Sequence, residues 1–578
     1  MKLTLPSSKF CATTAAAFFF VNGSVVLAQD DNRNEVSALK AQIQQMQKEY
    51  EDRITSLEAT VKSLQSTNQS GSILNTHVLT DADGKQIEGK APELDESFLE
   101  SLTRNFAFSA YIRAGVQFNG NGGGGNFNFN PPDSGGADSG RPRLGNENDV
   151  YMELTWFQAH MLGDSPDVMD VSMTFTPSIR YVQSRSTFTG GHGGVENSGN
   201  DFDFVMRQAF LEMSNVFKSA PEITFWGGQR FYDRFNIDPM DYYFLDTSGY
   251  GAGVKNIDLG FGKLYLGYIG GLNASEISPS IGTFYKHTID VRIKDINIGF
   301  GTLMPVLIGN FEKGTTFTEG YDQNGNIVNL TNPVRAKSAW GIGGGLVYDL
   351  HFGTGTNNNW LQIYALFGRG ATNFSAGDDL HTITGAENYF VFKHPGILPG
   401  QTIDVGSVIN KAHVFRVGAQ YFWAPAPVFS LSAWAFWEQS NDGYFVAGTN
   451  AAGVNKVVSG NRNIYQFGIR PAYWIADNFA IQGQAFGSYQ DNNRTSPGTN
   501  SFGRSGTMGV FTIAPTLKPK GGYFTRPELR VFATYSIWTP SLQGATTPIQ
   551  EGGNDYAPPY NGNTDHGWLF GTQVEWYF

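Results

Sequence analysis

From about residue 105 to the end of the chain, apolar and polar residues alternate with a period of two, in short segments separated by Gly-, Asn-, Asp- and Ser-rich stretches. The first segment places Phe106, Phe108, Ala110, Ile112, Ala114, Val116 and Phe118 on one face and Ser109, Tyr111, Arg113 and Gln117 on the other. Similar alternation recurs at 150–156, 289–294 and 528–537, and the chain closes with Val574-Glu575-Trp576-Tyr577-Phe578. Alternation that ends on an aromatic residue is typical of a transmembrane β-barrel strand, although a single segment would also fit a soluble edge strand.

The length of this region sets the size of the expected barrel. The 474 residues from 105 to 578 allow on the order of 16–18 strands of roughly 10 residues each, with their loops. Long polar stretches such as 119–147 and 184–201 alternate with short turns, an asymmetry typical of outer-membrane barrels. We therefore predict an all-β fold, a transmembrane antiparallel β-barrel of about 18 strands wide enough to hold a channel.

A different pattern precedes the barrel. Residues 29–66 contain a run rich in helix formers, and its apolar positions recur at spacings of three and four: Val36, Leu39, Ile43, Met46 and Tyr50, then Ile54, Leu57, Val61 and Leu64. This spacing predicts a short coiled coil with one stutter, and hence an oligomer. A single amphipathic helix packed on another domain would show the same spacing. Residues 67–104 show no sustained period and are interpreted as a linker in the periplasm.

The N-terminal 28 residues resemble a secretory signal peptide. Lys2 and Lys9 precede a small, apolar stretch that ends in Val26-Leu27-Ala28, small side chains that suit signal-peptidase cleavage. The single cysteine, Cys11, lies inside this segment, so the exported chain is expected to carry no disulfide. A net charge of −12 argues against nucleic-acid binding. We expect no cofactor.

Four aromatic residues share the predicted polar face with charged residues. Tyr111 accompanies Arg113, Tyr151 accompanies Glu153, and Tyr577 accompanies Glu575. Phe524 has the parity of Glu528 and Arg530 if Pro527 does not break the register. Rings beside Arg, Asp and Glu suit sugars, because the apolar face of a pyranose stacks on an aromatic ring while its hydroxyls form hydrogen bonds. The rings would otherwise fill space inside the barrel or belong to its interfacial girdle.

The barrel region resembles the maltoporin family of sugar-specific outer-membrane channels. The resemblance covers about residues 106–578 and rests on FSAYIRAG at 108–115, PRLGNENDVYMEL at 142–154, the long block from FWGGQRFYDRF to GFGKL at 225–264, TRPELRVFATYSIW at 525–538 and the C-terminal GTQVEWYF. It implies an eighteen-stranded barrel in a homotrimer, in the outer membrane, with an aromatic file through each pore. The coiled coil is similar to the periplasmic extension of the sucrose-porin branch.

The resemblance also assigns roles to individual residues. Tyr111, Tyr151, Phe524 and Tyr577 match positions of the aromatic file, and Trp360 lies close to a further position that Asn357 occupies by strict alignment. The positions implied to bond sugar hydroxyls or to narrow the pore are Arg113, Arg143, Glu153, Arg207, Arg234, Asp241, Tyr243 and Asp246. Arg234, Tyr243 and Asp246 are of the maltoporin type, which favours maltose and maltodextrins as substrates. The family's disulfide near the first loop is absent, since Asn148 occupies one of its positions.

Other functions were weighed against this one. A sucrose or other carbohydrate porin, or a general diffusion porin of low selectivity, would share the fold. A glycosidase built on Asp241 and Asp246, or on Glu153, would need a desolvated cleft that separates the pKa values of its two carboxyl groups, and the resemblance assigns these residues to sugar contact. An envelope-tethering protein would use the coiled coil to bind the cell wall and the barrel only as an anchor. The coiled coil would equally fit a role in holding a trimer together or in recruiting a periplasmic binding protein. The sequence therefore predicts a passive sugar channel and no enzymatic activity.

Overall fold

The computed structural model describes the barrel region and leaves residues 1–104 outside the described part of the chain. Described are residues 105–120, 129, 142–147, 149–163, 165–182, 202–273, 284–312, 316–321, 327–335, 338–353, 359–370, 372, 374, 412–441, 446–449, 455–457, 461–492, 505–543 and 564–577. The predicted signal peptide, coiled coil and linker lie outside these residues and stay predictions. In the described part of the chain, no helix has the length and apolar character needed to cross a membrane.

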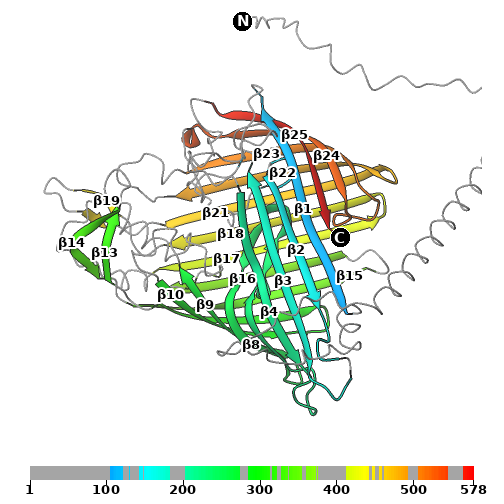
Figure 1. The fold of residues 1–578 in the computed structure, drawn as a ribbon. Helices are drawn as coiled ribbons and strands as arrows, with labels where there is room; N and C mark the ends of the chain where they lie inside the picture. The colour runs from blue at the N-terminus through cyan, green and yellow to red at the C-terminus, as the bar shows by residue number, and fades with distance from the viewer. Residues whose placement is uncertain are drawn as a thin grey trace, which may run out of the picture. The chain divides into compact units, whose positions relative to one another are not determined.

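Eighteen long strands form one antiparallel sheet (Figure 1). They are β1 (Phe106–Asn119), β2 (Asp149–Gln158), β3 (Asp170–Val182), β4 (Phe202–Ser214), β5 (Thr224–Arg230), β8 (Gly249–Asp258), β9 (Lys263–Asn273), β10 (Phe284–Lys294), β12 (Thr302–Glu312), β15 (Ala339–Phe352), β16 (Asn359–Gly370), β17 (His413–Ala426), β18 (Phe429–Asn441), β21 (Asn461–Ala476), β22 (Phe479–Asn492), β23 (Gly506–Leu517), β24 (Glu528–Trp538) and β25 (His566–Tyr577).

Short elements complete the described structure. The two-residue strand β11 (Ile296–Asn297) pairs with β12 in the main sheet. Three pairs of short strands form separate two-stranded sheets: β6 (Phe235–Ile237) with β7 (Tyr242–Leu245), β13 (Thr316–Tyr321) with β14 (Ile327–Arg335), and β19 (Val446–Thr449) with β20 (Asn455–Val457). The 3₁₀ helices are η2 (Asp238–Met240) and η3 (Pro540–Leu542).

The sheet closes on itself, because the first strand pairs with the last. Nine residue pairs join β1 to β25, from Tyr111 opposite Tyr577 to Asn119 opposite Leu569. In Figure 1 the blue β1 and the red β25 lie side by side. The predicted antiparallel barrel of about 18 strands is therefore confirmed. Strand connections at one end are short, such as 427–428 and 477–478, and those at the other are long, so the short turns face the periplasm.

Burial follows the predicted alternation along the strands. On β1, Phe106, Phe108, Val116 and Phe118 are exposed, whereas Arg113 and Gln117 are buried. On β10, Ile289 is exposed while its neighbours Asp290 and Arg292 are fully buried. Charged side chains thus point into the barrel and large apolar ones point outward. This arrangement inverts that of a soluble protein and is the one a membrane-spanning barrel requires.

Candidate functional site

A row of three tyrosines lies on the inner wall where the barrel closes. The rings of Tyr111 and Tyr577 are stacked, with centroids 4.9 Å apart. The ring of Tyr151 continues the row, with its centroid 6.0 Å from that of Tyr111. The three side chains come from β1, β25 and β2, which are neighbours in the sheet. The structure therefore brings together three of the residues that the sequence placed on the polar face.

Charged groups flank this row on both sides. The Arg113 guanidinium lies 5.1 Å from the Tyr151 ring centroid, and the Arg526 guanidinium lies at the same distance from that of Tyr577. Both are within the range of cation–π attraction. Tyr151 donates a hydrogen bond to Glu153, and Tyr111 donates one to Glu575 over 3.4 Å. Rings and hydrogen-bonding groups thus alternate along the wall.

Arg143 joins this wall to two loops that fold into the barrel. Its Nη2 donates a 2.7 Å hydrogen bond to the Tyr111 hydroxyl, and its Nε donates a 3.2 Å bond to Glu147. Its backbone N–H donates to the carbonyl of Pro239, and its Nη1 lies 3.5 Å from Asp238. Segment 142–147 of the first loop is thereby connected to segment 231–248 of the third loop.

Segment 231–248 carries four of the predicted site residues. The Arg234 guanidinium lies 4.8 Å from the Tyr243 ring centroid and 3.4 Å from that of Phe231. Burial, with the charge of Asp241 next in importance, raises the pKa of the Tyr243 hydroxyl above its ordinary value, so this group stays a neutral hydrogen-bond donor. Asp241 has left-handed backbone angles (φ 53°) directly after η2, and Asp246 accepts a 2.9 Å hydrogen bond from the Ser248 backbone N–H.

The opposite wall holds this segment in place. The Tyr242 ring stacks on Phe436 at 4.2 Å between centroids, and the Phe244 ring stacks on Tyr364 at 3.7 Å. The Tyr242 hydroxyl donates a 2.9 Å hydrogen bond to Glu438, which also accepts one from Arg416 at 2.8 Å. Stacking, a neutral hydrogen-bond donor and an ion pair thus fix the third loop against the inner wall of the barrel.

A second group of rings lies near the periplasmic end. The Phe422 ring centroid is 5.6 Å from that of Phe524 and 6.4 Å from that of Trp360. Phe524 was assigned to the polar face by strand parity, but β24 begins only at Glu528. Phe524 instead belongs to the turn 518–527, with 49% of its surface exposed, and its position depends on the fold of that turn.

Buried charges hold this turn. Lys518, which is fully buried, donates hydrogen bonds from Nζ to the Tyr523 carbonyl at 3.0 Å and to Glu528 at 2.6 Å. Arg526 donates to the Tyr523 carbonyl at 2.9 Å and lies 3.3 Å from Glu575. Desolvation by burial lowers the pKa of the Lys518 ammonium to about 8, against the favourable charge of Glu528. The turn that carries Phe524 is therefore tied to the wall that carries Tyr577.

The remaining predicted site residue, Arg207, lies farther along the wall. Its Nε donates a 3.1 Å hydrogen bond to the Ser178 hydroxyl. Arg207 is the extra residue of a β-bulge, because Thr176 is opposite Gln208 and Pro177 is opposite Met206.

Phe422 and Asp238 belong to the candidate site although no sequence motif marks them. Phe422 lies between Phe524 and Trp360 and shares the inward parity of Arg416 and Gln420 on β17. Parity alone would have identified it. Asp238 accepts hydrogen bonds from Arg143 and from Tyr523, at 3.5 and 2.7 Å, and its role follows from the way two distant loops meet.

Comparisons with known proteins identify a family and several relatives. The family model described as "LamB porin" matches residues 106–577. The chain is 23% identical to the maltoporin of Photobacterium profundum over 476 residues, covering 77% of this chain and 91% of that protein. It is 25% identical to maltoporin 1 of Klebsiella pneumoniae over 473 residues, covering 81% and 92%. Among solved structures, OccAB2 of Acinetobacter baumannii is 8% identical over 83% of this chain and 99% of that one, with a TM-score of 0.37.

Proposed function

The chain belongs to the LamB porin family of outer-membrane porins, and we propose that it is a sugar-specific channel that conducts maltose and maltodextrins by passive diffusion. The observation that carries the proposal is the tyrosine row with its flanking charges. The Tyr111 and Tyr577 rings are stacked on the inner wall, and 40% of the Tyr577 surface is exposed. No bond of the substrate is broken in this scheme.

The arrangement suits a linear glucose chain. Each glucose unit presents an apolar ring face, which can lie on the tyrosine row, and hydroxyls at its edge, which can exchange bonds with Arg113, Arg143 and Glu153. Successive units of the chain are chemically equivalent, so one contact replaces another as the chain advances. Such multiple weak sites permit binding without trapping the substrate.

The third loop, segment 231–248, would select sugars by their shape. Arg234, Tyr243 and Asp246 are similar to the maltoporin type in sequence and belong to segment 231–248, and the Arg234 guanidinium lies over the Tyr243 ring. We propose that this segment narrows the pore. A sucrose porin or a general diffusion porin remains the alternative. The second group of rings, Trp360, Phe422 and Phe524, would continue the sliding path toward the periplasm.

We also propose that the channel is a homotrimer and that the N-terminal segment forms a coiled coil in the periplasm. Both proposals rest on the family resemblance and on the spacing of apolar residues at 33–66, which is that of a coiled coil. The coiled coil would strengthen the trimer or bind a periplasmic partner. The mass of the full-length protein in detergent, compared with that of a variant lacking residues 33–66, tests both.

Swelling of liposomes that contain the protein tests substrate selection. We expect maltotriose to enter much faster than a polyethylene glycol of equal hydrodynamic size, because only the sugar can use the stacking path. Sucrose serves as the second sugar. Equal rates for the sugar and the polymer would favour a general diffusion porin, and a clear preference for sucrose would move the protein to that branch of the family.

A further inference from the structure

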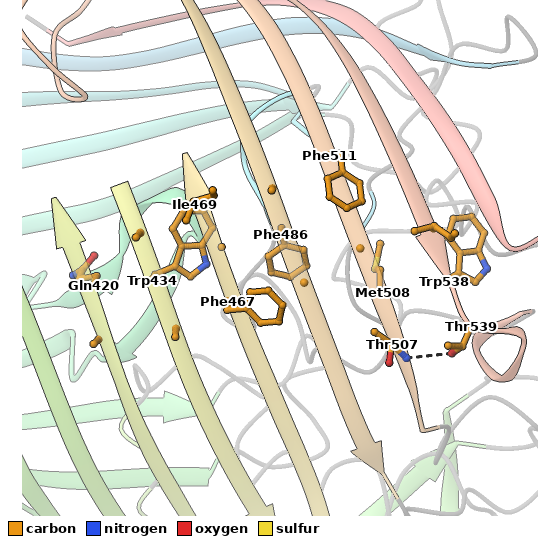
Figure 2. A pocket seen from close by; sticks show the side chains of 18 of the residues that line it. Gln420, Trp434, Phe467, Ile469, Phe486, Thr507, Met508, Phe511, Trp538 and Thr539 are labelled. Atoms are coloured by element: carbon orange, nitrogen blue, oxygen red, sulfur yellow. Dashed lines mark hydrogen bonds between the residues drawn. The ribbon is translucent and has the colours of Figure 1, made fainter. Parts of the chain in front are cut away.

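An apolar groove crosses the outer face of the barrel, on the wall formed by β17, β18, β21, β22, β23 and β24 (Figure 2). Its volume is about 1000 Å³. On each strand the residues that line it are outward-facing neighbours, such as Ala433 and Ala435 or Ala485 and Gly487, together with the backbone between them. The groove therefore lies outside the pore and has no part in the sliding path.

The groove exists because small residues lie opposite one another across the strands. One line of directly paired residues contains four small ones, Ala419, Ala435, Gly487 and Gly509, with Phe467 between the two pairs and Ile537 at the end of the line. The Phe467 ring covers Gly487, since a Cβ at that glycine would lie 2.5 Å from the ring. At Gly509 a Cβ would lie 3.3 Å from the Phe511 ring and 3.5 Å from Ile537, so a larger side chain there would displace the Phe511 ring slightly and would occupy part of the groove.

Aromatic girdles place the groove within the hydrocarbon part of the membrane. On the extracellular side, the three strands β18, β21 and β22 carry a row of rings two positions beyond the groove. The row consists of Trp437, Tyr465 and Tyr489, with 6.0 Å between the centroids of consecutive rings. Toward the periplasm, Trp423 and Phe429 pair at 6.0 Å. Such rows mark the two membrane interfaces. The groove lies between them and adjoins the outer one, so its surroundings are the chains of the outer leaflet.

The extracellular end of the groove is polar. Thr507 and Thr539 lie there, and the Thr507 backbone N–H donates a 3.1 Å hydrogen bond to the Thr539 hydroxyl (Figure 2). The other outward-facing residues of the lining are almost entirely Ala, Gly, Phe, Ile and Tyr. A long apolar channel with hydroxyls at its interfacial end matches an amphipathic molecule whose chain runs into the membrane.

We propose that this groove binds an acyl chain of an outer-leaflet lipid as a specific, retained ligand. The depth between the girdles, the polar outer end and the row of small residues all favour a lipid chain. A second barrel would contact the exposed side chains of Phe467, Ile469 and Phe511 at the edges of the groove. It would leave the groove between them empty, and the van der Waals contacts of the groove lining would be lost. The acyl chain fills the groove and packs against these side chains.

Native mass spectrometry of the full-length protein in detergent, delipidated and then titrated with lipid A, tests the proposal. The variant Ala485→Leu/Gly509→Leu fills the groove. The matched control, Gly309→Leu on β12, adds the same side chain at an outward glycine with nothing within 4 Å of its Cβ. We expect wild type and control to retain lipid A equally and the filled variant to retain at least fivefold less.

Folding is checked by the heat-dependent mobility of each variant on a gel, and Ala435→Leu replaces the double variant if that one does not fold. Equal retention by the filled variant and wild type, or no retained lipid A in wild type, would overturn the proposal. A filled variant with unchanged lipid retention but fewer protomers per particle would show that the groove is an interface between copies of the chain.

Discussion

Tyr111 and Tyr577 lie directly opposite each other on the first and last strands of the barrel, with their rings stacked at 4.9 Å. The contact that closes the fold therefore also forms the centre of the proposed sugar path. Two residues that are 466 positions apart in the sequence supply one continuous aromatic surface only when the barrel is closed. The proposed binding surface therefore forms only when the whole sheet is correctly assembled.

Replacement of Tyr577 by alanine is expected to weaken sugar binding about 2- to 12-fold, which corresponds to the ~0.5–1.5 kcal/mol of an aromatic contact. The current carried by small ions should be unchanged or larger, because side-chain volume is removed from the path. The measurement is the sugar concentration that halves the ion current. Trp576→Ala is the matched control, since Trp576 is the outward-facing neighbour; equal effects of the two substitutions would contradict the role of the row.

Arg143→Met is expected to widen the pore and to destabilise the protein. The substitution removes the hydrogen bonds to Tyr111 and Glu147 and the link to Asp238. Loss of one partner of a buried ion pair typically costs about 3–5 kcal/mol. Single-channel conductance should rise, and the temperature of unfolding should fall. Arg143→Lys keeps the charge but loses the planar set of donors of the guanidinium, so we expect an intermediate conductance. Wild-type conductance in both variants would contradict the role of Arg143 in holding the two loops inside the barrel.

Phe422 is expected to act as a positioning residue for the second group of rings. Only 7% of it is exposed, and it packs between Phe524 and Trp360. Phe422→Ala should weaken sugar binding to the same extent as Trp360→Ala while leaving small-ion conductance unaltered. Because a buried Phe→Ala change costs about 3–5 kcal/mol of stability, Phe422→Leu keeps most of the volume and should fall between wild type and alanine. If sugar blocks the ion current of Phe422→Ala as strongly as that of the wild type, Phe422 does not position the second group of rings.

Stability of the barrel should depend on pH through Lys518. Burial lowers the pKa of this ammonium to about 8, against an ordinary value of 10.5. Between these pH values the unfolded chain binds more protons than the folded one, so the free energy of unfolding rises with pH across the window and reaches its lower plateau below pH 8. Urea unfolding of wild type minus that of Lys518→Met isolates this group from others that titrate there. A difference that does not change between pH 7 and pH 10.5 would contradict the assignment.

How much of the site the sequence predicts depends on whether a residue lies in a strand. Tyr111, Tyr151 and Tyr577 lie within strands, where the period of two fixes the direction of the side chain, and their inward placement followed from parity. Phe524 lies in the turn 518–527, where parity has no meaning, and its position depends on the buried bonds of Lys518 and Arg526. The contact of Arg143 with Asp238 spans 95 residues and depends on two loops that fold inward, for which the local pattern carries no signal.

The measurement that tests the central claim most directly is single-channel conductance of the purified protein in a planar bilayer, titrated with the maltose series and with sucrose. The account predicts saturable block of the ion current that tightens as the glucose chain lengthens, because a longer chain covers more of the aromatic row. An open channel whose current no sugar reduces would contradict it.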